Sequence, residues 1–159
     1  MKQKNCHFKK IIGIDPGAKG GVAIYDEQED EMILHKCPET PKEMAAIINT
    51  AKLNQWDERA TCIIEKVPAF PTDARSSAFK FGCNFGKWLG ILGAYDIPTL
   101  EVTPQVWMKP LQPLPKIKRD RKNELKKIAI NLFPDNKVTL STCDAALMVV
   151  WYVNNEKED

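Results

Sequence analysis

Three acidic residues stand at positions where surface charge is not expected. Asp15 follows the apolar run 11–14, Glu65 follows the apolar run 62–64, and Asp144 precedes the apolar run 145–148. Clustered carboxylates repel one another unless a cation neutralises them, and hard oxygen donors suit Mg²⁺ or Mn²⁺. Two such ions, roughly 3.5–4 Å apart, can activate a water and stabilise the leaving oxygen of a phosphodiester. If the fold brings the acids together, the pattern predicts a two-metal site that hydrolyses phosphodiesters.

Each acid also has a purely structural interpretation. Asp15 opens an Asp-Pro-Gly sequence, which is common in turns. Glu65 could pair with a neighbouring lysine, and Asp144 could cap a helix. The catalytic hypothesis therefore depends on the three positions taken together. Both histidines, His7 and His35, lie outside this constellation, so no serine–histidine or cysteine–histidine arrangement competes with it.

The chain alternates segments of strand and helix character. Strands are expected at residues 11–15, 21–25, 32–37, 61–67 and 99–103. Helices are expected at residues 41–51, 76–95, 121–133 and 144–154. The short connections between the first three strands favour an antiparallel meander. The order predicts an α/β layered domain with a mixed five-stranded sheet flanked by helices.

Local signals place the acids within this domain. Thr40 is the expected N-cap of the first helix, Pro41 its first residue and Glu43 the partner in a capping box. A strand, a helix and a further strand imply a right-handed crossover between parallel strands. Asp15 and Glu65 would then lie at the same edge of the sheet, where ligands bind in such folds. The proline-rich stretch 104–115 is expected to be a surface loop. In the following helix, Leu132 is among the apolar residues expected to face inward, and the basic residues are expected to point outward.

The helix expected at residues 76–95 has an unusual composition. Its glycines fall on one stripe at helical spacing, at Gly82, Gly86, Gly90 and Gly93. Glycine inside a helix costs about 1 kcal/mol relative to alanine, so an aligned set indicates that another backbone approaches closely. That backbone belongs either to the sheet of the same chain or to a second copy of the chain.

Composition restricts the class of protein. The 159 residues, 43% hydrophobic and 28% charged, fit one globular domain, with residues 1–9 and 155–159 expected to be flexible. No apolar run is long enough to span a bilayer, and the basic N-terminus is unlike a secretory signal. The five widely spaced cysteines argue against a disulfide framework and favour a reducing cytosol.

Charge is unevenly distributed along the chain. The formal net charge is only +2, but residues 109–127 contain eight basic residues against two acidic ones. A basic patch on a nearly neutral chain suggests that a polyanion docks on one surface. A solvated helix face is the alternative.

An ordered set of motifs covers nearly the whole chain. In chain order they are Ile12–Gly17 with Gly20-Gly21, Ile64–Val67, Ser76–Gly82, Val102–Trp107, Leu132–Pro134 and Cys143–Leu147. Together they resemble the RuvC-like Holliday junction resolvases, most closely the phage-encoded branch. The resemblance implies an RNase H-like fold and a homodimer that uses the glycine-striped helix. It also implies magnesium-dependent paired nicking of four-way DNA junctions during recombination and repair, in the cytoplasm of a bacterial host.

The resemblance also assigns individual residues. Asp15, Glu65 and Asp144 match the metal-binding acids of the family, and Lys122 matches a lysine beside the scissile phosphate. Phe70 lies near the position of an aromatic residue that wedges into the junction. The other expected DNA contacts are Lys118, Arg119, Arg121 and Lys126.

One position departs from the family pattern. Bacterial members carry an acid or a histidine three residues before the final aspartate, where this chain has Ser141. Serine is a poor metal ligand, so we expect one well-defined metal position and a second that another group or the substrate phosphate completes. Phage relatives can also have loose substrate preference, so forks and flaps are further expected substrates.

Two other functions fit parts of the pattern. YqgF-type relatives share the Asp-Pro-Gly strand and act on RNA. A non-catalytic module that binds branched DNA could keep the fold, with Ser141 marking a damaged site. Sugar-kinase and actin-type ATPases also begin with an acidic glycine turn, but they need two such domains, for which this chain is too short.

Overall fold

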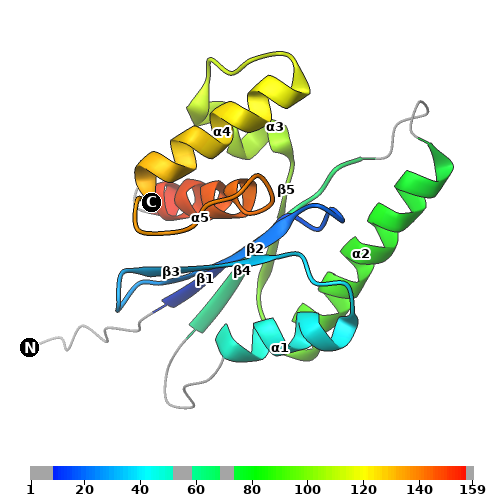
Figure 1. Cartoon of the computed structure of the whole chain (residues 1–159). Coiled ribbons are helices and arrows are strands. Elements are labelled where there is room, and N and C mark those ends of the chain that lie inside the picture. The colour runs from blue at the N-terminus through cyan, green and yellow to red at the C-terminus, as the bar shows by residue number, and fades with distance from the viewer. Residues whose placement is uncertain (1–8, 52–58, 69–73, 157–159) are drawn as a thin grey trace, which may run out of the picture.

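A single mixed sheet forms the centre of the molecule (Figure 1). The computed structural model describes residues 9–51, 59–68 and 74–156. The strands are β1 (Lys9–Ile14), β2 (Gly21–Asp26), β3 (Glu31–Lys36), β4 (Arg59–Glu65) and β5 (Thr99–Val102), in the spatial order β3-β2-β1-β4-β5. β1, β2 and β3 pair antiparallel, while β4 is parallel to both β1 and β5. The predicted meander and mixed five-stranded sheet are confirmed.

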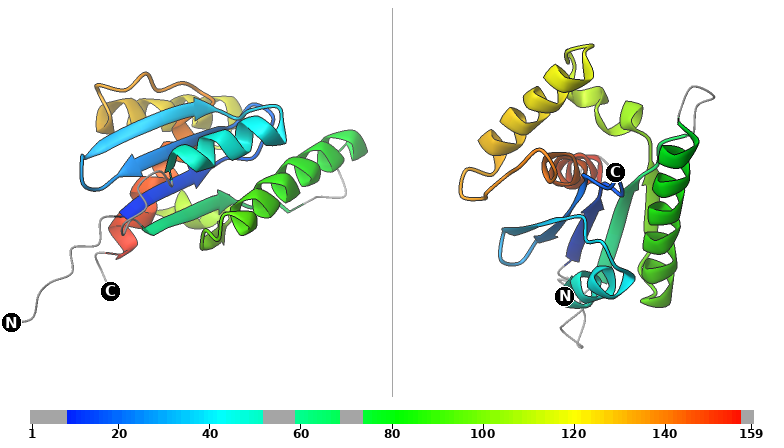
Figure 2. Two further views of the ribbon diagram at one scale, coloured as in Figure 1. Left: turned by 90° about the horizontal axis from the view of Figure 1, so that it is seen from below. Right: turned by 45° about the vertical axis from the view of Figure 1, so that its right-hand side comes forward.

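Helices cover both faces of this sheet. They are α1 (Pro41–Ala51), α2 (Arg75–Ala94), α3 (Pro104–Trp107), α4 (Lys118–Leu132) and α5 (Cys143–Glu156), with a 3₁₀ turn η1 at Lys109–Leu111. α1 and α2 lie on one face, and α5 lies on the other with α4 packed against it (Figures 1 and 2). Within the described residues, none of these helices is long and apolar enough to cross a membrane.

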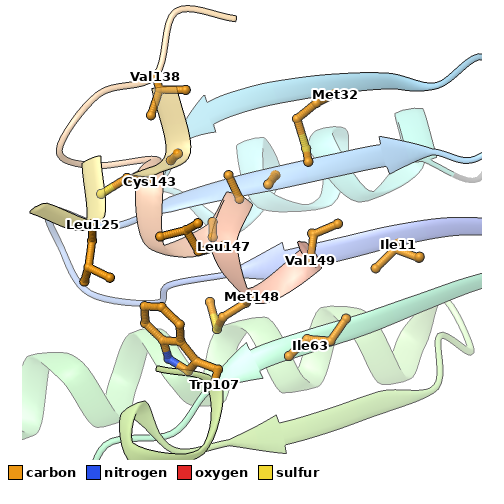
Figure 3. Close-up of a cluster of buried hydrophobic side chains, with 14 of the residues drawn as sticks. Ile11, Met32, Ile63, Trp107, Leu125, Val138, Cys143, Leu147, Met148 and Val149 are labelled. Carbon is orange, nitrogen blue, oxygen red and sulfur yellow. The ribbon is translucent and has the colours of Figure 1, made fainter. Parts of the chain in front are cut away.

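Alternation along β1 divides the core into two clusters. Ile11 joins the cluster beneath α4 and α5, which Figure 3 shows, whereas Ile12 and Ile14 join the cluster beneath α1 and α2. Side chains of a strand point alternately to opposite faces, so an apolar run without alternation predicts a strand buried on both faces. This double burial holds β1, and the acid that follows it, at the centre of the sheet.

The first helix begins as its sequence predicts. The backbone N–H of Glu43 donates to Thr40 Oγ1 at 3.3 Å, and the backbone N–H of Thr40 donates to Glu43 Oε2 at 3.1 Å. Because Pro41 lacks an N–H, it fits the first helical position without losing a bond. The predicted capping box is confirmed.

Gly13 allows α5 to approach the sheet closely. A Cβ atom on Gly13 would lie 2.2 Å from the backbone carbonyl oxygen of Ala145. The neighbouring atom belongs to backbone, so it could yield only if the helix moved. The first turn of α5, which carries Asp144, is therefore seated directly against β1.

Three expectations about the second half of the chain are wrong. Residues 104–115 are not a plain surface loop, because they contain α3 and η1, and Trp107 is only 1% exposed. Leu132 does not point inward: it lies in the last turn of α4 and is 49% exposed. The basic residues of α4 do not all point outward, because Lys122 is turned toward two acids.

The outermost described elements overlap the two segments expected to be flexible. Lys9 already belongs to β1, and Asn155 and Glu156 belong to α5. The rest of the two expected flexible segments, residues 1–8 and 157–159, lies outside the described residues.

The glycine stripe of α2 does not face the sheet. A Cβ atom added at any of its glycines would meet nothing within 4 Å among the described residues. The neighbouring face of the helix buries Trp88 and Leu92 instead. Packing against the described part of the chain therefore does not explain the stripe.

Candidate active site

The three predicted acids come together at one edge of the sheet. β1 and β4 pair so that Ile14 lies opposite Ile64, which places Asp15 and Glu65 side by side at the carboxyl ends of the strands. Asp144 is the second residue of α5, the helix seated on β1. Their exposures are 9% for Asp15, 7% for Glu65 and 8% for Asp144, so the site contains three buried carboxyl groups.

A tight turn fixes the carboxylate of Asp15. The backbone N–H of Gly17 donates to Asp15 Oδ1 at 3.0 Å, and the backbone N–H of Asp15 donates to the Gly21 carbonyl at 2.9 Å. A Cβ atom on Gly20 would lie 2.2 Å from the Asp15 carbonyl oxygen, so only glycine allows the turn to fold back this closely. Asp15 is thus a turn residue, as the Asp-Pro-Gly sequence suggests, and the turn orients its side chain toward the other acids.

Lys122 joins the acids from α4. Its Nζ donates to Asp144 Oδ2 at 2.5 Å and lies 3.8 Å from Asp15 Oδ2. Burial alone would lower the pKa of Lys122, but attraction to Asp144 and the hydrogen bond to it raise that pKa above its usual value. The ammonium therefore stays charged beside two carboxylates.

Burial and mutual repulsion disfavour charge on two of the acids. Burial raises the pKa of Asp15, and the negative charge of Asp144 raises it further, against the lowering influence of Lys122. Burial, followed by repulsion from Asp15, raises the pKa of Glu65 to about 7. Raised carboxyl pKa values in one cluster are a common sign of a functional site. A bound cation would restore the charged forms of these acids.

Trp107 contacts Glu65, and sequence reasoning missed it. Its indole Nε1 donates to Glu65 Oε1 at 2.9 Å, and both side chains are buried. The signal available in the sequence was Pro104, which suits the first position of a helix, followed by a large apolar residue one turn later. The interpretation of the whole stretch as a loop concealed that signal.

Cys143 is a second residue that sequence reasoning did not place in the site. Its Sγ lies 3.3 Å from Asp144 Oδ1, within hydrogen-bonding distance for a thiol donor. Burial, and then the charge of Asp144, raise the pKa of Cys143 to about 12. The group is therefore a neutral thiol that orients Asp144, not a nucleophile.

The donor set of the site fits a hard divalent cation. Among the residues that the structure describes, no group of three His, Cys, Asp or Glu side chains is already arranged to hold one. The acids are nonetheless hard oxygen donors and they are buried, and burial together with repulsion between the acids raises the pKa of Asp15 and of Glu65. A bound Mg²⁺ or Mn²⁺ would accept these oxygens as ligands and neutralise their negative charge.

The other predicted residues fall into different surroundings. Lys118 is close enough to lower the pKa of Asp15 slightly, and Arg119 is exposed beside Asp120. Arg121 donates through Nη1 to the backbone carbonyl of Lys116 at 3.1 Å, so it braces the loop before α4. Lys126 is partly buried on the same helix. Phe70 lies outside the described residues.

Ser141 lies three residues before Asp144 and supplies no carboxylate. A Cβ atom on Gly21 would lie 2.6 Å from the Ser141 carbonyl oxygen, so this backbone is packed tightly against β2. The neighbouring Thr142 is buried, and its Oγ1 accepts a hydrogen bond from the backbone N–H of Thr139 at 3.0 Å. This segment therefore anchors the start of α5, the helix that carries Asp144.

Comparison with solved structures identifies the fold. The chain is similar to Thermus thermophilus RuvC in complex with a Holliday junction substrate, with a TM-score of 0.58 and 15% identity over 92% of this chain and 96% of that chain. It is similar to the structure of Thermus thermophilus RuvC with a TM-score of 0.56 and 16% identity, over the same shares of the two chains. A likeness to the yeast mitochondrial Holliday junction resolvase Ydc2, with a TM-score of 0.42 and 12% identity, is too distant to carry an argument.

At these identities the likeness concerns the fold alone. The chain has the RNase H-like α/β fold of RuvC, with a mixed five-stranded sheet flanked by helices. Comparison of the sequence with models of protein families and with curated proteins finds no match.

Proposed function

We propose that this protein is a divalent-metal-dependent endonuclease that cuts branched DNA. It would resolve four-way Holliday junctions by paired nicking and also cut forks and flaps. The observation that carries the proposal is the meeting of three buried carboxylates and one charged lysine at the carboxyl edge of a RuvC-like sheet. Phosphodiester hydrolysis is the chemistry that such a group of acids serves best.

The acids would hold the metal, and their surroundings orient them for it. Asp15, Glu65 and Asp144 are the proposed ligands for two Mg²⁺ or Mn²⁺ ions, which supply an activated water and stabilise the leaving oxygen. Gly17 fixes Oδ1 of Asp15, and the Cys143 thiol contacts Oδ1 of Asp144. Each aspartate thus has one oxygen already oriented by the protein, and its other oxygen lies near Lys122.

Lys122 is proposed to act on the phosphate. Three carboxylates would repel an approaching phosphodiester, and a positive charge among them reduces that repulsion. Lys122 lies within 4 Å of two of the acids and remains charged. It is therefore placed to stabilise the charge that develops on the scissile phosphate.

The basic residues of α4 are proposed to guide DNA to the site. Lys118 and Arg119 open the helix on which Lys122 lies, and both are exposed. Phosphate contacts from such residues position a nucleic acid without reading its sequence, and they weaken as salt increases. We also propose that DNA contacts Lys126, Arg121 and Phe70.

A homodimer is part of this proposal. Paired nicking needs two active sites, and each chain supplies one. The open glycine face of α2 allows a second backbone to approach closely, since no atom of the described chain covers it. We therefore propose that two chains pair through α2.

Cleavage of defined substrates tests the proposal. The full-length protein is incubated with a labelled four-way junction, a fork, a duplex and an RNA–DNA hybrid, in Mg²⁺ or Mn²⁺. Nicking of the junction and the fork in preference to the duplex is expected. Preference for the hybrid would instead indicate a ribonuclease, and junction binding without cleavage would indicate a binding module.

Substitution of the site residues tests their roles in the same assay. Asp15→Asn, Glu65→Gln and Asp144→Asn should each abolish cleavage and leave junction binding largely intact, while Asp135→Asn, at an exposed acid, should change neither. Lys122→Ala should lower the cleavage rate more than the affinity, whereas Lys126→Ala should mainly reduce the salt dependence of binding. Retained cleavage in two of the three acid variants would overturn the assignment of the site.

A further inference from the structure

We infer that Trp107 is a positioning residue that sets the orientation of the Glu65 carboxylate for metal binding. The inference rests on the proposed function, because it gives Glu65 the role of a metal ligand. Its physical basis is one buried hydrogen bond: the indole Nε1 of Trp107 lies 2.9 Å from Glu65 Oε1. Trp107 comes from the connection between β5 and α4, far in sequence from the acid that it contacts.

The chemistry of the indole makes this contact directional. An indole N–H can only donate, so the carboxylate must present an oxygen lone pair to it. Glu65 has a longer and more flexible side chain than an aspartate, and rotation about its terminal torsion is poorly restricted by itself. The bond to Trp107 holds one oxygen, Oε1, and thereby sets the direction of the other.

The indole also carries no charge. A lysine or arginine in this place would neutralise Glu65 and would compete with a cation for it, as Lys122 can at Asp144. A neutral donor orients the carboxylate and leaves its negative charge available. The site therefore holds Asp144 through the charged Lys122 and Glu65 through the neutral Trp107.

The position of the ring is fixed by the elements that carry the other site residues. Trp107 belongs to the buried cluster that contains Leu125 of α4 and Met148 of α5 (Figure 3). α4 also carries Lys122, and α5 carries Asp144. Packing of the ring against this cluster ties the orientation of Glu65 on β4 to the placement of both helices.

Trp88 provides a matched control. It is 0% exposed, like Trp107 it is a fully buried tryptophan, and it lies in the cluster on the opposite face of the sheet. Within the described residues its indole N–H makes no regular hydrogen bond, although the weakly accepting Cys37 thiol interacts with it. Replacing Trp88 by phenylalanine therefore removes similar packing without removing a contact to an acid.

Metal binding by the DNA-free protein tests the inference. Mn²⁺ affinity is measured by titration calorimetry for the wild type, Trp107→Phe and Trp88→Phe. Loss of a partner that orients a metal ligand typically weakens metal binding by roughly 10–100-fold, and this is expected for Trp107→Phe only. Equal weakening in the two variants would mean that Trp107 contributes only packing, and would overturn the inference.

Cleavage kinetics provide a second readout from the same variants. Trp107→Phe should lower kcat for junction cleavage and leave junction affinity near that of the wild type, because the ring does not reach the surface where DNA would bind. If the wild type cleaves junctions and binds Mn²⁺ while Trp107→Phe matches Trp88→Phe, the inference fails and the proposed function stands. If the wild type neither cleaves junctions nor binds Mn²⁺, the proposed function itself is wrong.

A measurement on the folded wild type avoids dependence on a core variant. In ¹⁵N spectra of the metal-free protein, the indole N–H signal of Trp107 should shift when Mg²⁺ is added, and that of Trp88 should shift much less. Glu65→Ala, without any metal, should move the Trp107 signal upfield and leave the Trp88 signal unchanged. An unmoved Trp107 signal in Glu65→Ala would show that the hydrogen bond is absent, and the inference would be wrong.

Discussion

Glu65 is held where its own charge is disfavoured. Burial and the nearby Asp15 raise its pKa to about 7, while the bond from Trp107 lowers it only in part. Buried carboxylates of this kind reduce the stability of a folded protein, since the unfolded chain would ionise them freely in water. The proposed cation binding would explain why such a group stands at the end of a central strand.

Glu65→Gln should therefore stabilise the metal-free protein at high pH. The folded-state pKa of about 7 lies above the ordinary value of 4.5, so the folded protein binds more protons than the unfolded chain between these pH values. Its stability must then fall as pH rises through this window, by about 1.4 kcal/mol for each unit of pKa difference. Glutamine keeps an oxygen that accepts from Trp107 and cannot ionise. The variant should therefore lack this loss of stability with rising pH.

Urea unfolding in EDTA at pH 5 and pH 8 measures the effect. Glu65→Gln should exceed the wild type in stability at pH 8, and the difference should shrink at pH 5. Added Mg²⁺ should stabilise the wild type at pH 8 and have little effect on the variant. The same loss of stability between the two pH values in both proteins would show that Glu65 is not the group responsible.

The seating of α5 on β1 determines how two of the acids meet. Gly13 lies under the first turn of α5, and a methyl group there would come 2.2 Å from the backbone oxygen of Ala145. Gly13→Ala should push the helix away from the strand and move Asp144 relative to Asp15. Overpacking of this kind costs about 1–3 kcal/mol, and we expect cleavage to fall by more than the stability loss alone would cause.

Ile24→Val is the matched control for Gly13→Ala. It removes one methylene from the core beneath α1 and α2, at a cost of about 0.5–1.5 kcal/mol, and should leave the acids in place. Thermal unfolding and junction cleavage are compared for the two variants at a temperature where both are folded. Comparable cleavage by both would mean that α5 tolerates displacement, contrary to the prediction.

The sequence predicts the long elements well because they carry strong local signals. β1 is an apolar run, α1 has a capping box, and both were located within a residue or two of their observed ends. α3 spans one turn and has no periodicity to detect, and the prolines around it favour a loop in any local reading. What makes this segment helical is the burial of Trp107, a tertiary contact that local sequence does not contain.

The candidate site was predictable to a similar extent. Parallel pairing of β1 and β4 follows from topology, so the meeting of Asp15 and Glu65 could be expected. Lys122 could be singled out only by family resemblance, because the basic residues of α4 look alike until the helix is oriented against α5. Trp107 and Cys143 reach the acids through packing, and neither carries a pattern of its own.

The glycine face of α2 has no neighbour among the residues that the structure describes. One face of this helix closes the core through Trp88 and Leu92, while the glycine face is open. Phe79, near the start of the same helix, is also largely exposed. Four costly glycines on a face that no described residue covers are what the proposed contact with a second chain would explain.

Gly86→Ala distinguishes a dimer contact from a free surface by the sign of its effects. The added methyl meets nothing within 4 Å among the described residues of one chain, so in the monomer it should stabilise the helix by about 1 kcal/mol. In a close contact between two α2 helices, the same methyl should hold the backbones apart and weaken the dimer. We therefore expect a more stable monomer and a higher dimer dissociation constant from one substitution.

Analytical ultracentrifugation measures the dimer dissociation constant, and urea unfolding measures the stability of the monomer. The control is Asn123→Ala, at an exposed residue of α4, which should leave the dimer unchanged.

Gly86→Leu should separate the two chains further and should also change the products of junction cleavage. Two sites held in one dimer can nick both strands within the lifetime of one complex, whereas separated chains must nick independently. The Gly86→Leu protein should therefore accumulate singly nicked junctions, and a wild type that is monomeric at micromolar concentration would contradict the role assigned to α2.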